Sequence, residues 1–202
     1  IEEVEQLASK LVQDEYNAYF ALASFADPKE GRTSKNAEWF KSFFIDIDCG
    51  VGKPYADQAE GMTALKQFIK DAKLPKPMVV NSGRGVHAYW VLEEPMARDE
   101  WKPLAEGLKL LCERHKLDAD PSVTADSARI LRIPGTFNYK DSANPLHVTV
   151  IIKGDPVAND VFKDLFKLED DVFAGMVGKP FIPRQMDAMT LALMGNNISR
   201  FK

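Results

Sequence analysis

The most informative segment for the fold is Phe43-Phe44-Ile45-Asp46-Ile47-Asp48, an apolar run that reads as a strand and carries two carboxylates two positions apart. Successive side chains of a strand point to opposite faces. One face then holds Phe43, Ile45 and Ile47, and the other holds Phe44, Asp46 and Asp48. The two aspartates can share hard cations such as Mg²⁺ or Mn²⁺, which prefer oxygen ligands. The alternative is that this second face is exposed and both acids are simply solvated.

A glycine-rich turn follows at residues 81–90, Asn81-Ser82-Gly83-Arg84-Gly85-Val86-His87-Ala88-Tyr89-Trp90. Glycines on both sides of Arg84 allow a tight turn and a close approach to a ligand. The Ser82 hydroxyl, the Arg84 guanidinium and the His87 imidazole can all donate hydrogen bonds to phosphate oxygens. Taken alone, the segment is better explained as a hairpin turn with an incidental arginine and histidine.

The third segment runs from Asp120 to Lys140 and begins with Asp120-Pro121-Ser122-Val123-Thr124. Asp120 could complete a three-carboxylate metal site, and Asp118 and Asp126 are its competitors. Arg129, Arg132 and Lys140 form a basic cluster suited to phosphates. We expect a short helical turn near Ser127–Leu131, which would place Arg129 and Arg132 on one helical face. The alternative is an acidic loop that caps a short helix, with solvated arginines.

Length, composition and charge limit the classes of protein to which the chain can belong. The chain has 202 residues, of which 45% are hydrophobic, so a packed core is expected and global disorder is not. The net charge is −4 and the pI about 5.5, which argues mildly against general nucleic-acid binding. That argument is weak for a metal enzyme, since bound cations restore positive charge. Cys49 and Cys112 lack metal spacing, which excludes a zinc knuckle and fits a reducing, cytoplasmic setting. No run is long enough to span a membrane, and no secretory signal opens the chain.

Periodicity and turn residues predict the secondary structure. The expected helices cover residues 1–13, 56–73, 97–116 and 159–168, the last capped by Asn159 or Asp160. The expected strands cover residues 16–25, 43–48, 78–81, 86–92 and 147–153. Strands and helices do not alternate regularly, so the fold class is expected to be α+β.

The three segments together resemble the catalytic core of the archaeo-eukaryotic primase superfamily. They are most similar in general pattern to its phage- and plasmid-type members. The resemblance covers about residues 40–152, and its third motif, with Arg-Ile-Leu-Arg-Ile-Pro-Gly-Thr, is long and specific. It implies an RRM-like mixed or antiparallel sheet flanked by helices, plus an N-terminal α/β module. Residues 1–168 would form the catalytic domain. Residues 169–202 would form a tail, linker or accessory helices.

The resemblance also implies roles for individual residues. Asp46, Asp48 and Asp120 match the metal-binding triad, Asp120 being preferred for its offset from Val123. Ser82, Arg84 and His87 match residues that hold the triphosphate of an incoming nucleotide. Lys140 matches a phosphate-contacting lysine, although it follows Asn138-Tyr139 where relatives more often show His-Gly. Arg129 is a second candidate for a phosphate contact.

The expected function is that of a DNA primase-polymerase, a template-dependent nucleotidyltransferase that uses two Mg²⁺ or Mn²⁺ ions, dNTP or NTP substrates, and a single-stranded template with primer. Such domains often precede a helicase domain in one polypeptide of a prokaryotic, phage or plasmid replication system. Tyr89, Trp90 and Tyr139 are candidates for stacking on template, with core packing the better role for Trp90. One alternative is an RRM-like single-strand-binding module with exposed aromatic residues. Another is a metal-dependent nuclease, which is disfavoured because the three histidines show no His-x-His spacing.

Overall fold

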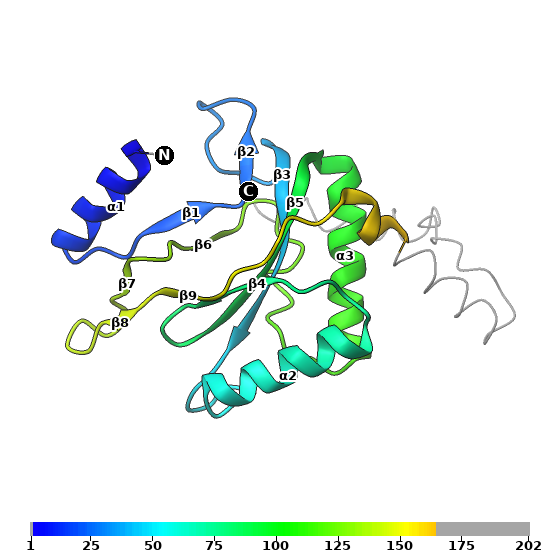
Figure 1. Cartoon of the computed structure of the whole chain (residues 1–202). Coiled ribbons are helices and arrows are strands. Elements are labelled where there is room, and N and C mark those ends of the chain that lie inside the picture. The colour runs from blue at the N-terminus through cyan, green and yellow to red at the C-terminus, as the bar shows by residue number, and fades with distance from the viewer. Residues whose placement is uncertain (1, 165–202) are drawn as a thin grey trace, which may run out of the picture. The chain divides into compact units, whose positions relative to one another are not determined.

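The computed structural model describes residues 2–164, and its centre is a five-stranded antiparallel sheet (Figure 1). Within these residues the strand order is β2-β3-β5-β4-β9. The strands span β2 Ala23–Phe25, β3 Ala37–Asp48, β5 Gly85–Ala97, β4 Met78–Asn81 and β9 Thr149–Ile152. The predicted α+β class is confirmed, and β3 and β5 are each longer than the sequence indicated.

Two helices, α2 (Gln58–Asp71) and α3 (Arg98–Arg114), lie along one side of this sheet (Figure 1). Both agree with the predicted helices to within two residues. The N-terminus of α2 is fixed by the Asp57 side chain, which accepts a hydrogen bond from the Glu60 N–H at 2.9 Å. Gly61 of α2 lies against Ile47 of β3, so the apolar face of β3 is the face that the helices cover. The face that carries Asp46 is therefore turned the other way.

The N-terminal segment contains helix α1 (Glu2–Gln13), as predicted, and then two short strands in place of the single one predicted for residues 16–25. Strand β1 (Tyr19–Ala21) pairs with a distant segment, whereas β2 joins the edge of the central sheet. Leu22 is buried at the corner between them, where its N–H donates to the Arg129 carbonyl at 3.1 Å. The prediction of one strand is wrong because the chain passes here from one sheet to another.

The helical turn predicted near Ser127–Leu131 is also wrong. The chain instead forms strand β6 (Ile130–Arg132), which pairs antiparallel with β1 in a two-stranded sheet. The register joins Tyr19 to Arg132, so the pairing spans more than a hundred residues of sequence. No local pattern indicates such a partner, and the apolar pair Ile130-Leu131 fits a strand as well as a helix.

The C-terminal part of the described chain departs from the prediction at one point. The strand predicted at 147–153 is divided at buried Val148 into β8 (Leu146–His147), which pairs with β7 (Phe137–Asn138), and β9. Residues 159–164 are helical, as predicted. The Asn159 side chain bonds the backbone of Glu94 at 3.0 and 3.3 Å. The predicted remainder of this helix, the boundary at residue 168 and the tail 169–202 lie outside the described residues.

The core is aromatic and lies between the sheet and α3. Trp101 of α3 is fully buried, stacks on Phe40 with centroids 3.9 Å apart, and donates from Nε1 to the Ser42 carbonyl at 3.0 Å. Phe162 packs against Phe43 at 4.3 Å. Within residues 2–164, none of the helices has the length and apolar character that crossing a bilayer requires. This core holds β3 and β5 rigidly in place, and these strands carry the residues considered next.

Candidate active site

Asp46 and His87 face each other across the two central strands. The register of β3 and β5 pairs Asp46 with His87 and Asp48 with Gly85. His87 Nε2 lies 3.6 Å from Asp46 Oδ1, and the His87 side chain is 3% exposed against 20% for Asp46. The first and second sequence motifs therefore meet on one face of the sheet, at the end where β3 finishes and β5 begins.

The third motif reaches the same place through a backbone hydrogen bond. The Asp120 N–H donates to the Asp46 carbonyl at 2.8 Å, and the Asp120 carboxylate accepts from the Ser122 N–H at 2.8 Å. Its two sequence competitors have other local contacts. The Asp118 N–H donates to the Tyr55 hydroxyl at 2.9 Å, and the Asp126 carboxylate accepts from the Ala128 N–H and lies 3.2 Å from Arg129.

The three carboxylates interact electrostatically across the site. Burial, followed by the charges of Asp48 and Asp120, raises the pKa of Asp46 to about 7. The guanidinium groups of Arg129 and Arg132 act in the opposite direction and lower that pKa. The Asp46 carboxylate therefore lies in a poorly solvated place, beside two other acids and two arginines.

The imidazole of His87 is neutral in this environment. Burial, followed by the charge of Arg132, lowers the pKa of His87 to about 4, and Asp48 offsets this only in part. A neutral imidazole can donate one hydrogen bond to an anion but adds no positive charge. Positive charge must therefore come from other groups.

The Ser82–Gly85 turn is held between β3 and the β7–β8 hairpin. Gly83 has a φ of +91°, and its N–H donates to Asn81 Oδ1 at 2.7 Å. A Cβ at Gly83 would lie 2.9 Å from the Asn138 Cβ, so only glycine fits beside the hairpin. Asn138 Nδ2 donates to the Ser82 carbonyl at 2.9 Å. These contacts hold the turn in one conformation and join the second sequence motif to the third.

The predicted phosphate contacts occupy two places. Arg84 and Lys140 are exposed beside this turn, where Arg84 lies 3.7 Å from Asp141 and the Lys140 N–H donates to Asn138 Oδ1. Arg129 lies nearer the acids and donates from Nη2 to the Ser122 carbonyl at 2.8 Å. The Cys49 N–H, one residue beyond Asp48, donates to the Arg84 carbonyl at 3.1 Å, so the two places adjoin.

Two further cations lie near the acids: Arg132, which the sequence predicted only as a member of the basic cluster, and Lys53, which it did not predict. Arg132, on β6, donates to Asn17 Oδ1 at 3.3 Å, lies over the Tyr19 ring at 5.0 Å, and has a buried Nε without a hydrogen-bond partner. Lys53 Nζ lies 2.6 Å from Asp48 Oδ2. The signal for Lys53 was its place in a glycine-rich loop directly after the acid pair. The position of Arg132 near the acids became known only from the strand register, because the sequence predicts a helical turn there.

Two of the three aromatic residues predicted to stack on a template are buried and not available for it. Tyr89 is 2% exposed and Trp90 is fully buried, with Nε1 donating to the Pro75 carbonyl at 2.7 Å. The Tyr139 hydroxyl donates to the Val12 carbonyl at 3.2 Å and so ties α1 to the domain. Template stacking by Tyr89 and Trp90 is wrong, and the core role of Trp90 is confirmed.

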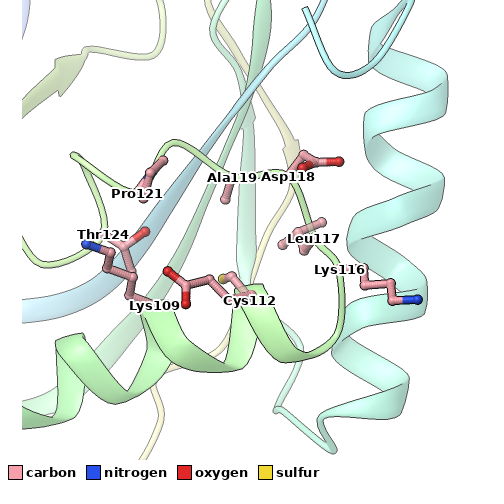
Figure 2. Close-up of a pocket in the computed structure, with 9 residues that line it drawn as sticks. Lys109, Cys112, Lys116, Leu117, Asp118, Ala119, Pro121 and Thr124 are labelled. Atoms are coloured by element: carbon pink, nitrogen blue, oxygen red, sulfur yellow. The ribbon is translucent and has the colours of Figure 1, made fainter.

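A pocket of about 370 Å³ lies between the C-terminal half of α3 and the loop that carries Asp120 (Figure 2). Its lining comprises Lys109, Cys112, Glu113, Lys116, Leu117, Asp118, Ala119, Pro121 and Thr124. Of the acids considered as metal ligands, only Asp118 lines it, whereas Asp46, Asp48 and Asp120 do not, so this pocket and the acid cluster are different features.

The relation to known proteins agrees with this arrangement. No family model matches the chain. It is 29% identical over 127 residues to a replication protein of Clostridium perfringens, an alignment that covers 61% of this chain and 30% of that protein. The structure is similar to the AEP domain of the cyanophage S-2L primase-polymerase, with a TM-score of 0.59, 16% identity, and coverage of 79% of this chain and 75% of that one. The fold that the resemblance implied is thereby confirmed: this chain has the fold of the AEP domain of a phage primase-polymerase.

Proposed function

We propose that this domain is a template-dependent nucleotidyltransferase, a DNA primase-polymerase that joins nucleoside triphosphates to a growing strand. The observation that carries the proposal is the meeting of Asp46, His87 and Asp120 across β3 and β5, with Asp48 on the same face. Support comes from the nature of the similar proteins, a primase-polymerase and a replication protein. The chain aligns with 30% of the length of that replication protein. A helicase domain in the same polypeptide, which the family resemblance implies, is part of the proposal.

The donor set fits divalent cations. Three carboxylates supply the oxygen ligands that Mg²⁺ and Mn²⁺ prefer, and the pKa of the buried Asp46 is raised to about 7. Within residues 2–164, no three aspartate, glutamate, histidine or cysteine side chains lie close enough together in this conformation to hold a metal ion. Asp48 is paired with Lys53, and the Asp120 carboxylate accepts a hydrogen bond from the Ser122 N–H. A bound ion would compete with Lys53 for the Asp48 carboxylate.

Bound ions would supply the Lewis acidity that activates a primer 3′-hydroxyl and stabilises the leaving pyrophosphate. The chain's own residues would bind and orient the substrate. Ser82, Arg84 and Lys140, beside the glycine turn, would contact the triphosphate from one side. Arg129 and Arg132 would contact it from the side of the acids, where Arg132 has a buried donor without a partner. His87, being neutral, would donate one hydrogen bond from Nε2 to a phosphate oxygen.

The experiment is an extension assay with a labelled primer on a single-stranded template, with dNTPs or NTPs and with Mg²⁺ or Mn²⁺. The expected result is extension that requires the divalent ion and stops when EDTA is added. Binding of the strand without extension would support the RRM-like module instead. That alternative lacks its expected exposed aromatics at Tyr89 and Trp90. Shortening of the strand without nucleotides would support the nuclease.

Lys53→Met is expected to tighten Mn²⁺ binding by up to about fivefold, because the lysine ammonium competes with a metal for the Asp48 carboxylate and an exposed ion pair of this kind is weak. Isothermal titration of the metal-free protein with Mn²⁺ measures the effect. Lys163→Met is the control, since Lys163 is similarly exposed but pairs with Glu100 and Asp160. Equal affinities of Lys53→Met and wild type would remove Asp48 from the ligand set.

A further inference from the structure

We propose that Tyr89 is a positioning residue, whose hydroxyl donates to Nδ1 of His87 and so keeps the His87 proton on Nε2, the nitrogen that faces Asp46. The consequence of this proton for nucleotide binding rests on the function proposed above. The hydrogen bond and the tautomer are independent of that function and can be tested separately. The step is one of orientation alone, with no bond formed or broken.

The geometry of the pair is fixed by the strand. His87 and Tyr89 are two residues apart on β5, so both side chains leave the same face of the sheet. His87 Nδ1 and the Tyr89 hydroxyl are 3.1 Å apart, and the two rings meet edge to face with an interplanar angle of 86°. Each residue is 2% exposed, which leaves little room for water to replace this contact. Phe20 of β1 lies against Tyr89, with centroids 6.2 Å apart, and limits its movement.

The direction of the hydrogen bond follows from what lies on the other side of the imidazole. A neutral imidazole carries one proton, and its other nitrogen presents a lone pair. If Nδ1 donated to Tyr89, the Nε2 lone pair would face Asp46 Oδ1 at 3.6 Å, which is repulsive whenever Asp46 is ionised. If Tyr89 donates to Nδ1, the Nε2–H group faces that carboxylate, which is attractive. Burial and the charge of Asp46 also raise the pKa of the Tyr89 phenol far above its usual range, so its proton is available.

The consequence concerns any anion that enters the site. With the proton held on Nε2, His87 presents a donor toward the acids and toward a phosphate bound beside them. Without the hydroxyl, Nδ1 becomes free to take the proton, and part of the population would present a lone pair to the phosphate. A net hydrogen bond is worth about 1 kcal/mol, or about fivefold in affinity. We therefore expect Tyr89→Phe to raise the nucleotide KM about fivefold and to change kcat less.

The test is imidazole ¹⁵N NMR on the histidine-labelled full chain, comparing wild type with Tyr89→Phe. Phenylalanine keeps the ring and its packing on Phe20. The wild type is expected to show His87 purely as the Nε2–H tautomer, and Tyr89→Phe is expected to show a mixture. His115 and His147 serve as internal references, and His87→Gln assigns the signals. Tyr139→Phe is the matched control, because it removes a hydroxyl bonded to the Val12 carbonyl and should leave the His87 signals unchanged.

The outcomes separate the two proposals. A wild-type His87 with its proton on Nδ1, or unchanged His87 signals in Tyr89→Phe, would overturn the role of Tyr89 whatever the activity. An unchanged nucleotide KM together with an altered tautomer would overturn the binding consequence. A locked Nε2–H tautomer in a wild-type protein that never extends a primer would overturn the proposed function and leave the tautomer assignment standing.

Discussion

Asp46→Asn is expected to abolish nucleotide incorporation, with a loss of about a thousandfold or more, and at the same time to stabilise the metal-free protein at neutral pH. The loss of activity follows from the proposed function, in which the change removes a metal-binding charge, and metal stabilisation of a transition state is worth several kcal/mol. The gain in stability follows because the wild-type carboxylate is buried beside Asp48 and Asp120, which raise its pKa to about 7. Asparagine is close in shape and carries no charge.

The pH dependence gives this prediction its sign. A carboxyl whose folded pKa lies above the unfolded value of 3.8 binds protons more tightly in the folded protein. Below pH 3.8 the group is protonated in both states and contributes nothing. As pH rises from about 4 to about 7, the unfolded state loses its proton first, and the free energy of unfolding falls. The fall is roughly 2–4 kcal/mol, because each pKa unit corresponds to about 1.4 kcal/mol and neighbouring acids share the effect.

The measurement is urea unfolding in EDTA between about pH 4 and pH 8, alongside the extension assay. The wild-type free energy of unfolding should fall across this range more steeply than that of Asp46→Asn. Asp155→Asn is the control, because Asp155 is an exposed aspartate outside the site. Activity within tenfold of wild type would rule out Asp46 as a ligand. Parallel pH curves would show that Asp46 titrates normally in the folded protein.

Gly85→Ala is expected to destabilise the protein by about 3 kcal/mol or more. Among the substitutions that add one methyl group, it is the one for which we predict the larger loss of stability. A Cβ at Gly85 would lie 2.3 Å from the Ile47 carbonyl oxygen, and backbone cannot move aside as a flexible side chain can. Gly85 pairs with Asp48 at the end of β3, and its carbonyl accepts from the Ser82 N–H at 3.0 Å. The added methyl group would force the two strands apart beside the acids.

Urea unfolding compares Gly85→Ala with Gly31→Ala. Gly31 has a φ of +61° and open space where a Cβ would lie, with no atom within 4 Å, so its substitution costs only about 1 kcal/mol of backbone strain. Circular dichroism in the cold shows whether Gly85→Ala folds at all, and failure to fold would itself agree with the prediction. If the two variants proved equally stable, β3 and β5 would have to lie further apart than the structure places them.

The elements that the sequence predicted well are those with a strong local signal. Helix α2 begins after Asp57, whose side chain caps it, and α3 shows an apolar residue every third or fourth position. Strand β4 was predicted with its observed bounds, because an apolar run ends there at a glycine turn. The acid pair on β3 could be recognised for the same reason, since the alternation of side chains in a strand is a local property.

The elements that the sequence missed depend on distant partners. Strand β6 takes its conformation from β1, and the chain turns at Leu22 because the strands on either side pair in different sheets. A short apolar run is compatible with helix or strand until a partner is known. The expectation that Arg129 and Arg132 share a helical face failed for this reason, although both still act on Asp46.

The residue types of the candidate site, the strand that presents two of its acids and the α+β class could be predicted from the sequence, because they follow from side-chain periodicity and glycine placement. Three contacts became known from the fold alone: the Asp120 N–H donates to the Asp46 carbonyl, Lys53 pairs with Asp48, and Tyr89 is buried against His87. Those features depend on burial and on charges brought together from distant parts of the chain. Electrostatic energy and hydrogen bonding act over a few ångströms in space, and the order of residues along the chain does not specify those distances.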